Sequence, residues 1–291
     1  MKPAAFDYFA PESLDEALAL LGKHASSAKL LAGGQSFVPM ANFRLLRPEV
    51  VIDLNRIAAL SYIDERESGI AIGAMTRHRT VERSDLVRAR CPLIARAVPW
   101  IGHAVIRNRG TIGGSLSHAD PAAEWPVVAL ALGATLVVRS PRGERLIPAA
   151  DFFVALLTTA LADDEILVEI RFPAVPPRSG AEFLEISRRH GDFALVSVGA
   201  QVTLSATGAF EDIRLALGGV GPFAFDAAKE AKRLIGSKPA DEDLESLGHR
   251  VASAIEPNGD LHASAEYRKE VAAVLVARAL RTALARAKEN A

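Results

Sequence analysis

Two glycine pairs, each followed by a serine, constrain the fold of this chain more than any other feature. They lie in Ala32-Gly33-Gly34-Gln35-Ser36 and in Thr111-Ile112-Gly113-Gly114-Ser115. Because glycine has no Cβ and adopts positive φ at little cost, its backbone can approach a ligand closely, and N–H groups of such a turn can line a phosphate. A tight turn explains one pair alone but explains two matched pairs less well. We therefore predict two loops that hold one phosphate-bearing cofactor.

Neither segment fits another phosphate-binding motif. No Lys-Ser or Lys-Thr follows a glycine at the spacing of a P-loop, and neither segment contains G-x-G-x-x-G. Hydrolysis of nucleoside triphosphates is therefore not supported. Residues 219–224, Gly-Val-Gly-Pro-Phe-Ala, match the dinucleotide fingerprint with alanine in its last place. Pro222 removes an N–H from that turn, so we predict a strand-to-helix turn there and not a dinucleotide site.

Local patterns divide the chain into three regions. The predicted regions are residues 1–57, 58–175 and 176–291. In the first region a capping box, Ser13-Leu14-Asp15-Glu16, predicts a helix that ends near Gly22. Apolar runs predict strands at 29–32 and 50–54. The first region is therefore a small α/β unit.

The second region mixes strands with short helices. A polar turn predicts a hairpin over 62–72. Helical patterns cover 78–88 and 92–101, and runs rich in Val, Ile and Leu predict strands over 134–139 and 166–172.

The stretch 173–180 contains three prolines and a glycine, which disfavour regular structure, so we place a domain boundary there. Beyond it, strands come first and helices last, which is an α+β arrangement. The predicted elements of this third region are strands at 182–188, 194–204 and 213–217 and a long helix at 264–288.

Composition and charge narrow the function classes. Apolar residues make up 49% of the 291 residues and charged residues 24%, as in ordinary globular proteins. The formal net charge of −1 gives no field that attracts nucleic acid or an anionic membrane, so we expect neither as a partner. The N-terminus resembles no secretory signal, and the longest apolar stretch, 125–138, is too short to cross a bilayer. We expect a cytoplasmic location and no membrane span.

A single cysteine, Cys91, limits redox chemistry within this chain. It cannot form an internal disulfide, and it cannot alone hold an iron–sulfur cluster, which needs about four protein ligands. Any such cluster must sit on another chain. The apolar neighbours of Cys91 predict a buried small hydrophobe and not a reactive thiol.

Two polar segments are candidates for ligand contacts. His118, Asp120 and Glu124 follow the second glycine pair. A metal site is conceivable there, but hydrogen bonding to a sugar diol or capping of a helix by Asp120 fits better, since no second histidine is in register. Residues 188–193 predict an exposed charged turn, in which Phe193 could instead lie against a flat cofactor ring. No arrangement of Ser/His/Asp or Cys/His type stands out, so we name no catalytic residue and no metal ligand.

Four segments together resemble one protein family. In order, they are residues 32–39, 106–116, 187–192 and 264–268. They are similar to the FAD-binding medium subunit of molybdenum hydroxylases, of the carbon monoxide dehydrogenase and xanthine dehydrogenase type, and the resemblance covers nearly the whole chain. It implies a two-part FAD-binding domain like that of the vanillyl-alcohol-oxidase (PCMH-type) flavoproteins, followed by an α+β C-terminal domain.

The resemblance also implies a set of FAD contacts. Both glycine segments would bind the diphosphate and ribityl region, Glu124 would be an acidic contact, and Ile166 or Leu167 an apolar one. Phe193 can stack on the isoalloxazine ring, although some members of the family have tyrosine there. The predicted FAD contacts are Ala32, Gly33, Gly34, Gln35, Ser36, Thr111, Ile112, Gly113, Gly114, Ser115, Glu124, Ile166, Leu167 and Phe193. Some members have a lysine where this chain has Leu184 and Glu185, and its absence disfavours NAD as the acceptor.

The resemblance implies partner subunits as well. A large subunit would carry the molybdenum cofactor and a small subunit [2Fe-2S] clusters, and the FAD would pass electrons to quinone, oxygen or NAD. The expected assembly is a dimer of heterotrimers. Two alternatives are a stand-alone reductase or oxidase, similar to UDP-N-acetylenolpyruvoylglucosamine reductase, and a non-catalytic nucleotide-binding scaffold subunit.

Overall fold

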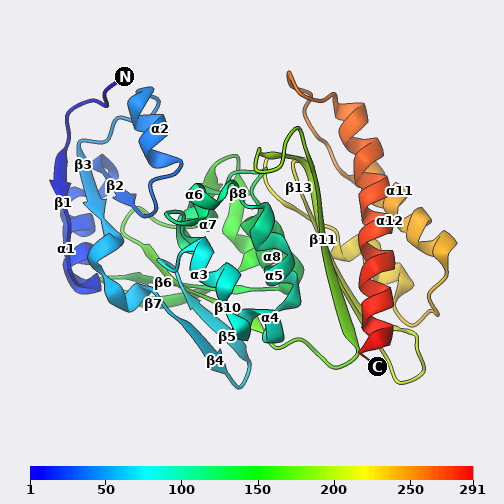
Figure 1. Ribbon diagram of the computed structural model, residues 1–291. Helices are drawn as coiled ribbons and strands as arrows, with labels where there is room; N and C mark the ends of the chain where they lie inside the picture. The colour runs from blue at the N-terminus through cyan, green and yellow to red at the C-terminus, as the bar shows by residue number, and fades with distance from the viewer. Residues whose placement is uncertain (291) are drawn as a thin grey trace.

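The computed structural model describes residues 1–290 and has the predicted α+β fold. Three main sheets follow one another along the molecule (Figure 1). A three-stranded parallel sheet lies near the N-terminus, a five-stranded antiparallel sheet in the middle, and a four-stranded antiparallel sheet near the C-terminus.

The N-terminal part packs on one face of the middle sheet. Its elements are β1 (Asp7–Phe9), α1 (Leu14–His24), β2 (Ala28–Leu31), α2 (Phe37–Asn42) and β3 (Val50–Asp53). Ser13 caps α1 by accepting a hydrogen bond from the N–H of Glu16, which confirms the predicted cap. Leu18 of α1 and Ile52 of β3 share a hydrophobic core with Val168 of the middle sheet. Burial of these side chains joins the two parts.

The middle part contains most of the short elements. Its strands are β4 (Ile63–Arg66), β5 (Gly69–Gly73), β6 (Thr135–Ser140), β7 (Gly143–Pro148), β8 (Phe153–Ala155), β9 (Thr158–Thr159) and β10 (Ile166–Pro173). Its helices are α3 (His78–Arg83), α4 (Asp85–Arg90), α5 (Pro92–Ala97), α6 (Ala104–Arg107), α7 (Ile112–His118), α8 (Glu124–Leu132) and α9 (Ala149–Phe152). Along β6, Val137 faces the N-terminal part, whereas Leu136 and Val138 face the helices, so both faces of this sheet are buried.

The hairpin predicted over 62–72 is confirmed by β4 and β5. Two helix predictions in the middle part are corrected by the structure. The single helix predicted over 78–88 is instead α3 followed by α4, because Ser84 is extended and its hydroxyl accepts from the N–H of Val87, which begins a new helix. The helix predicted over 92–101 ends early and continues as a 3₁₀ turn, where Pro99 cannot donate a helical hydrogen bond.

Cys91 is fully buried, as predicted, and burial raises the pKa of its thiol to about 12.

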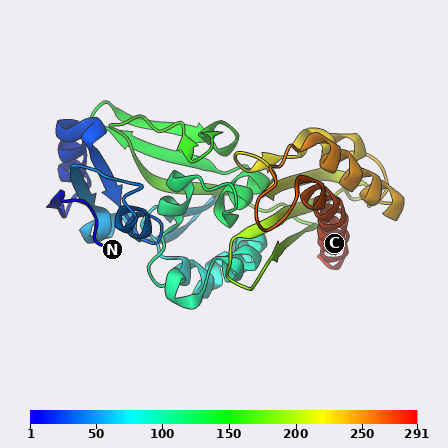
Figure 2. The ribbon, with the colours of Figure 1, turned by 90° about the horizontal axis from the view of Figure 1, so that it is seen from above.

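The C-terminal part is a sheet with helices on one face. Its elements are β11 (Ser179–Ser187), β12 (Ala194–Leu204), β13 (Phe210–Gly218), β14 (Phe225–Asp226), α10 (Ala228–Ala231), α11 (Asp241–Ala254) and α12 (Ala265–Glu289). Figure 2 shows α11 and α12 at one end of the molecule, with this sheet between them and the middle part. A Cβ at Gly180 would lie 2.1 Å from the carbonyl oxygen of Ala283, so α12 lies directly against β11. The other face, which includes Phe183, packs on α5 and α8.

The remaining connections are short. Five 3₁₀ turns occur among the described residues, and they are η1 (Ala25–Ser27), η2 (Leu54–Arg56), η3 (Ala58–Leu60), η4 (Val98–Trp100) and η5 (Lys232–Leu234). Residues 219–224 join β13 to β14, so the strand-to-helix turn predicted there is wrong and the turn joins two antiparallel strands. In the part of the chain that the structure describes, no helix is both long and apolar enough to span a bilayer.

Candidate cofactor-binding site

The two glycine segments, far apart in sequence, meet in space. We call residues 32–36 the first segment and residues 111–115 the second segment. A Cβ at Gly33 would lie 2.3 Å from the carbonyl oxygen of Arg109, so only glycine allows this approach. A Cβ at Gly114 would lie 3.2 Å from the Cβ of Ala32. The two segments therefore lie side by side, as one shared site requires.

A groove of about 390 Å³ opens beside the first segment. It is lined by Leu31, Ala32, Gly33, Gly34, Gln35, Val38, Pro39, Asp53, Asn55, Ile106 and Arg109. The lining combines residues of the N-terminal part with residues just before the second segment. The groove therefore follows the junction of the two parts.

The first segment is an irregular turn with open donors. Gly34 has a φ of 77°, which favours glycine, and its carbonyl oxygen accepts from the N–H of Val38 to begin α2. Among residues 1–290, no acceptor lies within hydrogen-bond distance of the N–H groups of Gly33, Gly34, Gln35 or Ser36. Polar backbone groups that are partly shielded and unpaired favour a ligand that accepts hydrogen bonds.

The second segment differs from the prediction, because Ile112 to Ser115 form the first turn of a helix and not a loop. Thr111 caps this helix, and its hydroxyl accepts from the N–H of Gly114 at 3.1 Å. The N–H of Ile112 donates to Thr76, that of Gly113 to Ala74, and that of Ser115 to Thr111. All four N–H groups of residues 112–115 are thus already satisfied inside the protein. The expectation that they would line a phosphate is not supported by this geometry.

Positive charge gathers where the two segments meet. Arg77 lies between β5 and α3, and Arg109 lines the groove. Burial lowers the pKa of Arg77, and the charge of Arg109 lowers it further. The one acidic residue in the lining, Asp53, is already engaged: it accepts from the Tyr8 hydroxyl at 2.6 Å and from the N–H of Asn55 at 2.9 Å. The groove therefore suits an anion.

Trp125, the neighbour of Glu124, is linked through His78 to Gly110, the residue just before the second segment. The indole N–H of Trp125 donates to Nδ1 of His78 at 3.0 Å, and the His78 ring packs on Gly110, where a Cβ would lie 2.6 Å from it. Burial lowers the pKa of His78 to about 3, so the ring is neutral and can accept this bond. Burial raises the pKa of Glu124 to about 7, with a smaller contribution from Asp120.

The remaining predicted residues lie elsewhere. Asp120 caps no helix but accepts from the N–H of Ala122 at 2.9 Å, while α8 begins at Glu124. The side chains of Ile166 and Leu167 lie in hydrophobic cores on opposite faces of β10. Phe193 is 69% exposed in the turn between β11 and β12 and is outside the groove lining.

The turn that carries Phe193 nevertheless touches the middle part. The rings of His190 and Trp100 stack with centroids 5.5 Å apart, and a Cβ at Gly191 would lie 2.3 Å from Nδ1 of His103. Residues 188–193 therefore dock on η4 and the loop after it, so the charged turn is anchored and not free.

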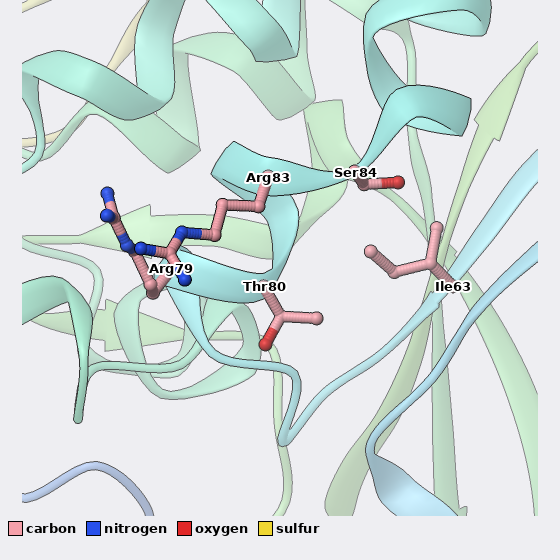
Figure 3. A pocket seen from close by; sticks show the side chains of 5 residues that line it. All are labelled: Ile63, Arg79, Thr80, Arg83 and Ser84. Atoms are coloured by element: carbon pink, nitrogen blue, oxygen red, sulfur yellow. The ribbon is translucent and has the colours of Figure 1, made fainter.

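A second pocket, of about 520 Å³, lies beside α3. It is lined by Ile63, Arg79, Thr80, Arg83 and Ser84, with the two arginines on one side and Ile63 on the other (Figure 3). Arg79 is paired with Glu82 at 2.8 Å. None of the predicted FAD contacts lines this pocket, so it is separate from the groove.

Three residues of the site were not predicted from the sequence. Asn55 contacts Ala32 of the first segment, Arg77 contacts Arg109 just before the second segment, and His78 contacts Trp125 and packs on Gly110. Their partners lie 23, 32 and 47 residues away, and no local pattern signals such contacts.

Two family models match successive parts of the chain, and relatives match it over nearly its whole length. Residues 4–175 match a family described as the FAD binding domain in molybdopterin dehydrogenase, and residues 181–283 match the CO dehydrogenase flavoprotein C-terminal domain. The chain is 41% identical to the 6-hydroxypseudooxynicotine dehydrogenase complex subunit alpha of Paenarthrobacter nicotinovorans, over 99% of this chain and 97% of that protein.

Solved structures agree with the sequence matches. A chain of carbon monoxide dehydrogenase from Hydrogenophaga pseudoflava is 39% identical and superimposes with a TM-score of 0.96, covering 98% of this chain and 99% of that one. A chain of quinoline 2-oxidoreductase from Pseudomonas putida 86 gives a TM-score of 0.93 at 33% identity, over 99% of both chains. The fold and the family matches thus define an FAD-binding oxidoreductase subunit. The chain belongs to the FAD-binding medium subunits of the molybdenum hydroxylases, the family of the carbon monoxide and xanthine dehydrogenases.

Proposed function

We propose that this chain is the electron-transfer subunit of a molybdenum hydroxylase complex, with FAD bound where the two glycine segments meet. One observation carries the proposal for the site: the N–H groups of Gly33, Gly34, Gln35 and Ser36 have no acceptor among the described residues, and they lie beside a groove with nearby arginines. A diphosphate supplies the acceptors and the negative charge that such a site requires. The groove therefore fits the diphosphate of FAD.

The proposed roles of the two segments differ. The first segment, Ala32 to Ser36, would hold the diphosphate through its backbone N–H groups. The second segment would let the cofactor approach closely, and the Ser115 hydroxyl would contact the diphosphate or the ribityl chain. Glu124, whose pKa of about 7 allows either protonation state near neutral pH, would bind a ribityl hydroxyl. Ile166 or Leu167, together with Phe193, would supply apolar contacts to the flavin end, beyond the residues that line the groove.

The protein's part in the chemistry is positioning. When bound, FAD can accept single electrons and release a pair, which suits a link between one-electron and two-electron carriers. We name no general acid or base in this chain. The backbone donors of Gly33 to Ser36 would hold the cofactor in place, and the buried core around β10 would exclude water from one side of the site.

We propose that two other subunits complete the complex. A large subunit would hold the molybdenum cofactor, and a small subunit would hold the [2Fe-2S] clusters and deliver electrons to this chain. Cys91, the chain's only cysteine, supports a cluster on another chain, since a cluster needs about four ligands. Quinone, oxygen or NAD would be the final acceptor, in a cytoplasmic dimer of heterotrimers. We also propose residues 1–57, 58–175 and 176–291 as the structural units, which the three separate sheets support.

Purification tests the proposal. The expected result is a yellow full-length chain with a flavin spectrum and no turnover on its own, which takes part in a complex containing molybdenum and iron when isolated from its native host. Turnover by the chain alone would favour the stand-alone reductase or oxidase. A colourless chain that takes up no added FAD would contradict the proposed function and favour the scaffold alternative.

A further inference from the structure

We infer that Arg77 and Asn55 form a positioning pair that fixes the first segment against the second segment and so prepares the groove for FAD. The inference rests on the proposed FAD-binding function, which gives the pair its purpose. Neither residue belongs to either glycine segment. The contacts that carry the inference run from Ala32 of the first segment through the side chains of Asn55 and Arg77 to the carbonyl of Arg109, just before the second segment.

Asn55 holds the first segment. Its Nδ2 donates to the carbonyl oxygen of Ala32 at 2.8 Å, and its Oδ1 accepts from Nη2 of Arg77. Because an amide nitrogen only donates and an amide oxygen only accepts, these two partners fix the orientation of the side chain. The backbone N–H of Asn55 also donates to Asp53, which in turn accepts from the Tyr8 hydroxyl. The amide is therefore anchored to the N-terminal sheet.

Arg77 holds the other side of the junction. Its Nη1 donates to the carbonyl oxygen of Arg109, while Nη2 donates to Asn55. The carbonyl of Arg109 is the group against which Gly33 packs. The backbone of Arg77 also forms a bridge with Thr111, the cap of the second segment. One planar guanidinium thus links Asn55, which holds the first segment, to the carbonyl of Arg109, two residues before the second segment.

The first segment needs such support because it has few hydrogen bonds of its own. Its four N–H groups at residues 33–36 have no acceptor in the part of the chain that the structure describes, and Gly34 is in a left-handed conformation. The side chain of Gln35 donates to the carbonyl of Gly33, which is a contact within the segment. Ordering a flexible turn at the moment of binding lowers affinity, so a segment fixed in advance binds more tightly.

A simple charge effect is the competing explanation. Arg77 could attract the diphosphate by its charge alone, in which case lysine would serve equally well. Lysine keeps the charge but lacks the rigid fork that reaches two acceptors at once. Arg77→Lys therefore separates positioning from charge, and Asn55→Ala removes the link to Ala32 without changing any charge.

FAD titration of the flavin-stripped full-length chain gives the main readout. We expect Arg77→Lys and Asn55→Ala each to raise the Kd for FAD by ~10-fold, which corresponds to ~1.4 kcal/mol. Because both act through one link, the double variant should be no more than about twofold weaker than the weaker single variant. Arg79→Lys is the matched control, since Arg79 lines the separate pocket of Figure 3, and its Kd should stay within about twofold of wild type.

Hydrogen exchange of the chain without flavin gives a second readout. The N–H of Val38 donates to Gly34 and that of Met40 to Ser36, so α2 depends on the position of the first segment. Exchange over residues 37–43 should be faster in Arg77→Lys and Asn55→Ala than in wild type and in Arg79→Lys. This measurement tests the pair even if the chain binds no FAD.

Several outcomes would overturn the inference. A wild-type Kd and unchanged exchange in Arg77→Lys would assign the arginine to charge alone or to no role. Additive effects in the double variant would show two independent contacts. If wild type itself binds no FAD, the proposed function fails, and the positioning pair is then judged by the exchange of α2 alone.

Discussion

The first and second glycine segments share a sequence pattern but differ in structure. The first is an irregular turn in which Gly34 has a positive φ and the N–H groups of residues 33–36 are open. The second is the first turn of α7, whose N–H groups at residues 112–115 are all used inside the protein. In both, glycine permits close approach of backbone to backbone. The shared glycine pairs thus indicate tight backbone packing. A segment can bind the diphosphate only if its backbone N–H groups are not already hydrogen-bonded inside the protein.

The largest effect is expected from Gly113→Val in the second segment. A Cβ there would lie 2.5 Å from the Cβ of Ala74 and 2.7 Å from its carbonyl oxygen, and valine adds two further methyl groups. We expect the free energy of unfolding to fall by ~3 kcal/mol or more, and bound flavin to be lost together with the fold. Urea unfolding followed by circular dichroism measures this change. A variant with wild-type stability would contradict the packing role of Gly113.

Gly34→Val should instead remove flavin while the fold survives. The Cβ of residue 34 has space, with Val38 3.3 Å away, but a φ of 77° is strained for a β-branched residue and costs about 1–2 kcal/mol. The segment would change conformation, and the Kd for FAD should rise by ~100-fold, since its N–H groups would no longer converge. Gly236→Val is the matched control, because Gly236 has a φ of 86°, open space around it and no part in the groove. Tight flavin binding by Gly34→Val would contradict the proposed role of the first segment.

Acid should destabilise the buried His78, which accepts a hydrogen bond from Trp125 and packs beside the second segment. The folded pKa of His78, about 3, lies below its unfolded value of 6.5 because burial disfavours the charged ring. The unfolded chain therefore binds more protons between these values, so stability is present above pH 6.5 and is lost as pH falls. Between pH 7 and pH 5 this residue should cost the wild type ~2 kcal/mol.

The variant His78→Phe tests the assignment of that acid sensitivity. Phenylalanine cannot accept from Trp125, so the variant should be less stable at pH 7 but should lose less stability between pH 7 and pH 5. Urea unfolding at both pH values gives the comparison. An equal loss in both proteins would show that other groups cause the acid sensitivity.

The smallest effects are expected from the paired serines. Ser36→Ala and Ser115→Ala each remove one hydroxyl from corresponding positions of the two segments, and each should raise the Kd for FAD by less than ~10-fold. The hydroxyl of Ser36 does not cap α2, so its loss should leave the helix intact. Titration of both variants shows whether the two segments contribute equal side-chain contacts although their backbones differ.

Much of the fold could be predicted because its signals are local. The hairpin of β4 and β5, the strand β10 and the long helix α12 follow from a polar turn, apolar runs and helical spacing of apolar residues. The helical state of the second segment could not, because Gly-Gly-Ser has low helix propensity. Carbonyl groups of Ala74 and Thr76, far away in sequence, accept its N–H groups and override that propensity.

In the site, too, the features set by local sequence could be predicted, whereas the contacts between distant residues could not. Glycine pairs can be read directly from the sequence, so the place of the groove was predictable. The contacts of Asn55 with Ala32 and of Arg77 with Arg109 join residues from separate parts of the chain. Such side chains carry no local pattern, and only the packed structure brings them to the junction.

A crystal structure of the flavin-loaded full-length chain would show directly which segment binds the diphosphate. We expect diphosphate oxygens within hydrogen-bond distance of backbone N–H groups of Gly33, Gly34, Gln35 or Ser36, while the N–H groups of residues 112–115 keep their acceptors inside the protein. A diphosphate held by the N–H groups of residues 112–115, with those of the first segment unbound, would contradict the proposed role of the first segment.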